Sequence, residues 1–261
     1  MSSQPVARKR HPVRRLVIAI VVIVVLVAAF FVGDAIARSY ATNYIREQVA
    51  SSLGLSSDAP VTADLGSGSV LLQAATGHLN NVNITIDPLT VAGLSGAATM
   101  QATDVPLDQP QPTKSVTLAV TVPATTVTKT LGTLPQLTAL SPKVKIEGSK
   151  VEVSGTANVF GIRVPIAITV VPGVSSGHPT FAVDSVKVSG ASIPVKTLNT
   201  YIPGIADALS TGSSLCIASA LPKQFELKSV TLTSDALVYT LGAENVALNS
   251  TALSQKGTCT K

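Results

Sequence analysis

The sequence contains no tryptophan, and only 3% of its 261 residues are aromatic. Sites that stack nucleic acid bases or sugar rings usually rely on aromatic faces, so this scarcity disfavours both kinds of site. Charged residues are also few, at 13%. Arg8, Lys9, Arg10, Arg14 and Arg15 lie near the N-terminus, which leaves 14 Lys and Arg against 14 Asp and Glu beyond residue 33. A neutral body of this kind lacks the positive charge that neutralises nucleic acid phosphates.

Residues that carry catalysis or bind metals are equally sparse. Beyond residue 33 there are only two histidines, His78 and His178, and no cluster of cysteines, so we expect no metal site. Neither a P-loop nor a dinucleotide fingerprint is present, and we expect no cofactor. Residues 173–177 match G-x-S-x-G and precede His178. A nucleophile elbow joins a strand to a helix, whereas this segment joins two predicted strands, so we interpret it as a loop and predict no enzyme.

The chain has two cysteines, Cys216 and Cys259, both far from the N-terminus. If this part of the chain is exported, a disulfide between them is the natural prediction. It would close a loop of about 43 residues and stabilise the fold by about 4 kcal/mol in the chain-entropy model. Two unpaired thiols are the alternative.

One long apolar run is present near the N-terminus. Residues 16–32 read LVIAIVVIVVLVAAFFV, and as a helix they would span about 26 Å of a hydrocarbon core of about 30 Å. The charges before the run are all positive, which predicts a cytoplasmic tail at residues 1–15, a single-pass cell membrane anchor at 16–33 and an extracytoplasmic domain at 34–261. The alternative is a cleaved signal peptide, because Ala35-Ile36-Ala37 resembles a cleavage site.

The remaining pattern predicts an α+β domain of long antiparallel sheets with helices laid against them. A helix is expected from Asp34, as its N-cap, to about Leu53, with an apolar stripe facing the core at Ile36, Tyr40, Tyr44, Ile45, Val49 and Leu53. Two further helices are expected over about 124–131 and 195–209. Segments in which apolar and polar residues alternate, separated by Gly and Pro, predict strands. They cover residues 79–86, 115–122, 144–147, 151–159, 162–171, 180–188, 225–233 and 236–241.

Three segments carry a resemblance to a known family. They are the basic tail and apolar run leading into a helix at Asp34-Ala35-Ile36-Ala37, the segment SGSVLLQAATGHLNNVNITID at 67–87, and LPKQFELKSVTLTSDALVYTLGAENVAL at 221–248. Together they resemble the LmeA-like phospholipid-binding proteins of the actinobacterial cell envelope. The chain shows Gly66-Ser67-Gly68 where that family usually has a Gly-Phe-Pro stretch.

The resemblance implies a tubular lipid-binding fold, in which a long, highly curved sheet wraps helices around an acyl-chain groove. It implies a non-catalytic binder of phospholipid or a related glycolipid, with envelope-biogenesis proteins as further partners. A structural or scaffolding envelope protein is the alternative function. We expect the seam between helix and sheet to hold the acyl chain, lined by Leu71, Leu72, Leu79, Ile84, Leu198, Tyr201, Ile202 and Ile205.

Overall fold

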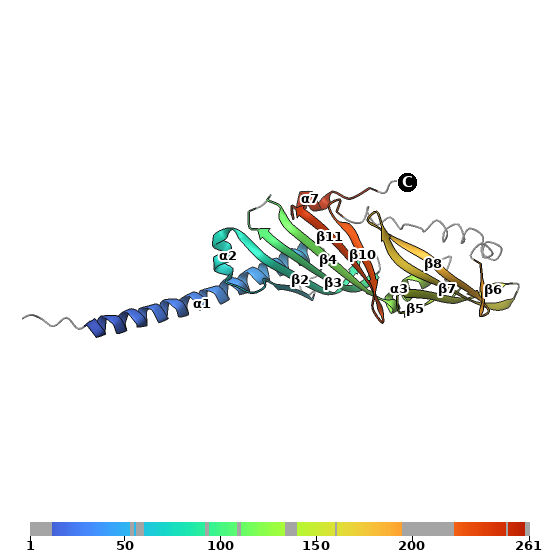
Figure 1. Ribbon diagram of the computed structural model, residues 1–261, viewed down its shortest axis with the longest axis horizontal. Helices are drawn as coiled ribbons and strands as arrows, with labels where there is room; N and C mark the ends of the chain where they lie inside the picture. The colour runs from blue at the N-terminus through green and yellow to red at the C-terminus, as the bar shows by residue number, and fades with distance from the viewer. Residues whose placement is uncertain are drawn as a thin grey trace, which may run out of the picture.

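The computed structural model describes residues 12–52, 55, 60–91, 94–108, 111–133, 140–159, 161–194, 222–248 and 250–258. These residues form an elongated molecule, with a long helix at one end and two antiparallel sheets in succession along the long axis (Figure 1). The two cysteines and the predicted helix over 195–209 lie outside the described residues, so the disulfide stays a prediction.

The first element is a single helix of 41 residues, α1 (Pro12–Ser52), which contains the apolar run and the predicted second helix without a break. Among the described residues it is the one helix long and apolar enough to cross a membrane. The side chains from Ile20 to Val32 are largely exposed, since no other described part of the chain covers them.

The C-terminal half of α1 packs on the sheet, and the predicted stripe is confirmed only in part. Ile45 and Val49 contact the core, together with the smaller Ala41 and Ala50. The predicted stripe residues Ile36, Tyr40 and Tyr44 are instead exposed, by 66%, 74% and 59%. Ala41 and Ala50, and not these tyrosines, therefore complete the face of α1 that meets the sheet. Leu53 lies outside the described residues.

The larger sheet, here called sheet A, has the strand order β1-β2-β3-β4-β11-β10. A short helix, α2 (Val70–Thr76), joins β1 to β2, and α7 (Ser250–Ser254) follows the last strand. The strands are β1 (Val61–Asp64), β2 (His78–Val91), β3 (Leu94–Pro106), β4 (Thr113–Pro123), β10 (Glu226–Leu232) and β11 (Ala236–Val246).

The smaller sheet, here called sheet B, is a meander in chain order β5 to β9. Helix α3 (Ala124–Thr133) connects the sheets, and its Thr128 Oγ1 accepts a hydrogen bond from Val144 N in the first strand of sheet B, at 3.0 Å. The edge strand β10 of sheet A lies against β7 and β8. The strands are β5 (Lys143–Glu147), β6 (Lys150–Val159), β7 (Ile162–Ser175), β8 (His178–Val188) and β9 (Ala191–Ile193).

All eight predicted strands are present, and α3 confirms the predicted helix at 124–131. The antiparallel prediction is confirmed for every described pair of strands, although the strands form two sheets and not one. The G-x-S-x-G segment is the hairpin between β7 and β8, with Ser176 and Gly177 both at positive φ (50° and 74°). Two positive φ angles are typical of a type I′ turn and not of a nucleophile elbow.

Candidate functional site

Sheet A has one apolar face that is continuous across its strands. Residues directly paired across an antiparallel ladder point to the same side. Leu118 of β4 pairs with Met100 on one side and Leu241 on the other, and Val120 pairs with Ala98 and Tyr239. The alternation within each strand therefore places one apolar surface on the side of the sheet that α1 covers.

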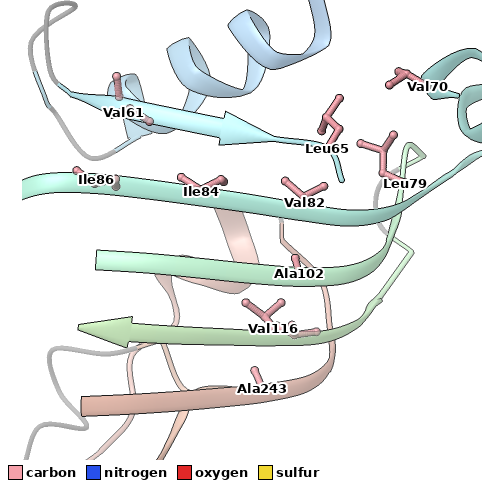
Figure 2. Close-up of a cluster of buried hydrophobic side chains, with 12 residues drawn as sticks. Val61, Leu65, Val70, Leu79, Val82, Ile84, Ile86, Ala102, Val116 and Ala243 are labelled. Carbon is pink, nitrogen blue, oxygen red and sulfur yellow. The ribbon is translucent and has the colours of Figure 1, made fainter. Parts of the chain in front are cut away.

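The part of this face next to α1 and α2 is fully buried. Figure 2 shows side chains from β1, β2, β3, β4 and β11 gathered into one cluster, whose members include Val82, Ala102 and Val116. Each of these three is at most 5% exposed. This part of the face is therefore closed core.

The middle of the same face is less completely covered. Met100, Leu118, Val120 and Tyr239 are only half-buried, and their pairings make them one contiguous group, here called the central patch. Fully buried neighbours such as Leu241 border it. The Tyr239 hydroxyl is its one polar side-chain group, and burial raises the pKa of Tyr239 above its ordinary value. The central patch is therefore a large apolar surface with incomplete cover.

The residues predicted to line the lipid site fall in three places. Leu79 and Ile84 are 6% and 4% exposed and belong to the closed core of sheet A. Leu71 and Leu72 lie on α2 and are 37% and 61% exposed. The structure thus separates these two pairs, and the remaining four, at 198, 201, 202 and 205, lie outside the described residues.

The sequence prediction did not name the central patch. Its signal was already visible in the strand pattern, because Leu118 and Val120 lie in the predicted alternation of residues 115–122. What the pattern could not show was which apolar positions would remain half-buried, since this depends on how far along sheet A the helix α1 extends.

A hollow of about 580 Å³ lies on sheet B. Its lining includes Lys143, Glu152 and Lys187, together with serine, threonine and glycine residues and the apolar Ile166. Charged side chains would lose hydration against a hydrocarbon chain, so this hollow is a poor acyl-chain site.

Two charged residues one turn apart on α1 fix the loop that leads into α2. Arg38 donates hydrogen bonds from Nη1 to Gly66 O at 2.8 Å and from Nη2 to Gly68 O at 2.5 Å. Asp34 Oδ1 accepts from Ser69 Oγ at 2.7 Å and from Leu71 N at 2.9 Å. Asp34 was predicted to cap its own helix, but α1 runs through it, and its carboxylate serves the start of α2 instead. We call this arrangement the α1–α2 clamp.

Removing the Arg38 guanidinium should loosen this clamp. Arg38→Ala leaves two backbone carbonyls without their charged donor, which we expect to lower the free energy of unfolding by about 1–2 kcal/mol. Hydrogen exchange should also rise at the amides of Leu71 and Leu72, whose acceptors the clamp holds in place. The control is Arg46→Ala, an exposed arginine on the same helix. Equal exchange in the two variants would contradict the role given to Arg38.

The structure thus defines a class of protein: an antiparallel β-domain that continues from a long apolar helix and carries an apolar sheet face with a half-buried centre. The family model of LmeA-like phospholipid-binding proteins matches residues 32–242, and the chain belongs to this family. No curated protein and no solved structure matches the chain.

Proposed function

We propose that this protein is a non-catalytic, membrane-anchored binder of phospholipid or a related envelope lipid, with its domain from Asp34 onward on the extracytoplasmic side. Membership of a phospholipid-binding family supports the lipid. The five basic residues before the apolar run, with no acidic residue there, support the orientation.

The observation that carries this proposal within the structure is the central patch. An acyl chain laid along it would cover Met100, Leu118, Val120 and Tyr239 and lose its own contact with water. Each methylene buried in this way contributes about 0.8 kcal/mol, so a long chain can be held without precise polar contacts. Sheet A would act as one wall of a groove and α1 as the other, with Ile84 and Leu79 supporting its floor at the α2 end. The predicted residues Leu198, Tyr201, Ile202 and Ile205 would complete the lining.

This arrangement is our proposal for the tubular fold expected from the sequence, in which the sheet curves around the helix and the lipid. It needs no catalytic residue and no cofactor. The candidate partners are phospholipid or glycolipid, the membrane itself and proteins of envelope biogenesis.

A charge placed on the central patch should remove bound lipid. In Leu118→Glu the carboxylate faces the proposed acyl chain, and burying it without a partner is costly. We expect lipid extracted from the purified full chain, and quantified by mass spectrometry, to fall several-fold. The matched control is Thr117→Glu, which adds the same charge at the preceding residue of β4, on the opposite and exposed face.

Two further measurements keep this test informative. Thermal unfolding of each variant separates loss of lipid from loss of the fold. Val120→Phe fills the patch without adding charge, so it should reduce bound lipid while leaving the protein folded. Lipid content unchanged in both Leu118→Glu and Val120→Phe would show that the patch is not the site, and absence of lipid from the unmodified chain would sink the proposal.

A further inference from the structure

Large apolar side chains are exposed at one corner of the domain. Among the described residues beyond α1, four such side chains are exposed: Leu71 by 37%, Leu72 by 61%, Leu107 by 48% and Ile162 by 68%. Leu71 and Leu72 lie in the first turn of α2, and Leu107 lies at the other end of this short helix, where Leu107 N donates a hydrogen bond to Gly77 O at 2.9 Å. We call Leu71, Leu72 and Leu107 the α2 corner. Ile162 is the first residue of β7, in sheet B, which lies farther from α2 than sheet A does (Figure 1).

The α2 corner adjoins the end of the apolar run. A Cβ atom at Gly33 would lie 3.6 Å from Leu71 Cδ1, and Asp34 binds the Leu71 amide in the α1–α2 clamp. The corner is therefore held at the level of the helix where the predicted membrane anchor ends. Figure 1 shows α2 beside α1 at the same end of sheet A.

The corner also has little charge. Residues 65–77, which include all of α2, contain no charged side chain. Asp108 follows Leu107 and is exposed, so the Asp108 carboxylate would lie in the headgroup layer and not in the hydrocarbon interior. Transfer of α2 into the boundary between headgroups and acyl chains would thus bury leucine side chains, while the charged Asp34 and Arg38 side chains of the α1–α2 clamp would lie in the headgroup layer.

We infer that the α2 corner inserts into the outer leaflet of the bilayer that α1 spans. This inference rests on the proposed membrane anchoring. The geometry favours the bilayer as the partner of this corner. The α1–α2 clamp holds the corner beside the end of the apolar run, so a bilayer that the run spans would have its surface next to the corner. The apolar run, about 26 Å long, is slightly shorter than a hydrocarbon core of about 30 Å, which draws the boundary toward the corner.

Insertion of the α2 corner would also place one end of sheet A against the membrane. The corner lies at the end of sheet A where β2 begins and β3 ends, since His78 pairs with Pro106. Seated in the outer leaflet, this end of the sheet would meet membrane lipid directly. Leu71 and Leu72 would then contact lipid within the bilayer and not the bound acyl chain.

The absence of tryptophan allows a direct test with single reporters. Three variants of the full chain, Phe30→Trp, Leu72→Trp and Ile162→Trp, would be reconstituted separately into phosphatidylcholine and phosphatidylglycerol vesicles that contain lipids brominated on their acyl chains. Phe30 reports on the anchor, and Ile162 is an exposed aliphatic control on sheet B. Leu72→Trp should show blue-shifted emission and several-fold stronger quenching than Ile162→Trp. Leu107→Trp is a second, independent reporter of the corner.

The outcomes separate this inference from the proposals on which it rests. If Phe30→Trp is quenched while Leu72→Trp and Leu107→Trp behave like Ile162→Trp, the corner does not enter the leaflet. The inference then fails, but the proposed membrane anchoring stands. If Phe30→Trp is not quenched, the anchoring fails and the inference fails with it. The lipid content of the purified chain, measured separately, reports on the central patch whatever the tryptophan variants show.

Discussion

Leu65→Ala should lower the free energy of unfolding by about 2–5 kcal/mol, as large-to-small substitutions in a closed core do. Leu65 is 1% exposed and lies in the core cluster with Val70 and Leu79 (Figure 2). It belongs to the loop between β1 and α2, so the cavity would open next to the α1–α2 clamp. Urea unfolding of the full chain in a mild detergent, followed by circular dichroism of the β-signal, measures the loss.

Ile162→Ala provides the matched control for Leu65→Ala. It also shortens an aliphatic side chain, but Ile162 is 68% exposed, so we expect a change within about 0.5 kcal/mol. A loss at Leu65 no greater than that at Ile162 would contradict the closed core described at this end of sheet A.

Gly96→Ala should be the second strongly destabilising change, costing about 1–3 kcal/mol or more. A Cβ atom at Gly96 would overlap the backbone carbonyl oxygen of Thr121 in the neighbouring strand β4, and it would also crowd the Val122 backbone. Backbone atoms cannot rotate away as the end of a flexible side chain can, so β3 and β4 would have to separate locally. Thermal unfolding of the full chain measures the effect.

The same substitution elsewhere in the chain should have the opposite sign. Gly132 lies in α3, where an added Cβ would meet no other atom within 4 Å. Alanine is favoured over glycine in a helix by up to about 1 kcal/mol, so Gly132→Ala should stabilise the protein slightly. Equal effects at Gly96 and Gly132 would show that the close approach of β3 and β4 is not a constraint on the fold.

The strand β3 illustrates where sequence patterns were insufficient. Its segment includes Gly96, Ala97 and Ala98, residues with weak strand preference, and the sequence did not predict a strand there. Pairing with β2 on one side and β4 on the other specifies it instead. Strands with clear alternation, such as β4 and β7, were predicted because each carries its own signal.

The helices, too, depend on contacts with residues that are distant in the chain and that a local sequence pattern does not show. A seven-residue helix such as α2 is too short for a periodic pattern, and it depends on Ser69 as N-cap and on Asp34, which is 35 residues away in the chain. On α1, the tyrosines at 40 and 44 suggested the core-facing side by hydrophobicity alone. The structure instead places Ala41 and Ala50 against the sheet beside Ile45 and Val49, which the predicted stripe also contained.

For the candidate site, the sequence predicted a phospholipid-binding family through resemblance, and the family match confirms that family. It could not select lining residues, because the burial of an apolar strand position depends on what covers it. Ile84 and Leu118 occupy equivalent places in alternating strands, yet Ile84 lies in closed core and Leu118 in the half-buried centre.

The unbroken course of α1 has a mechanical consequence. No linker intervenes between the apolar run and the half of the helix that packs on sheet A, so any tilt or rotation of one is imposed on the other. Mounted in a bilayer, such a domain could not swing like a tethered one. Residues 34–52 would set a reach of about 28 Å along the helix. Any molecule that meets this domain would therefore find it at a height above the bilayer that α1 sets.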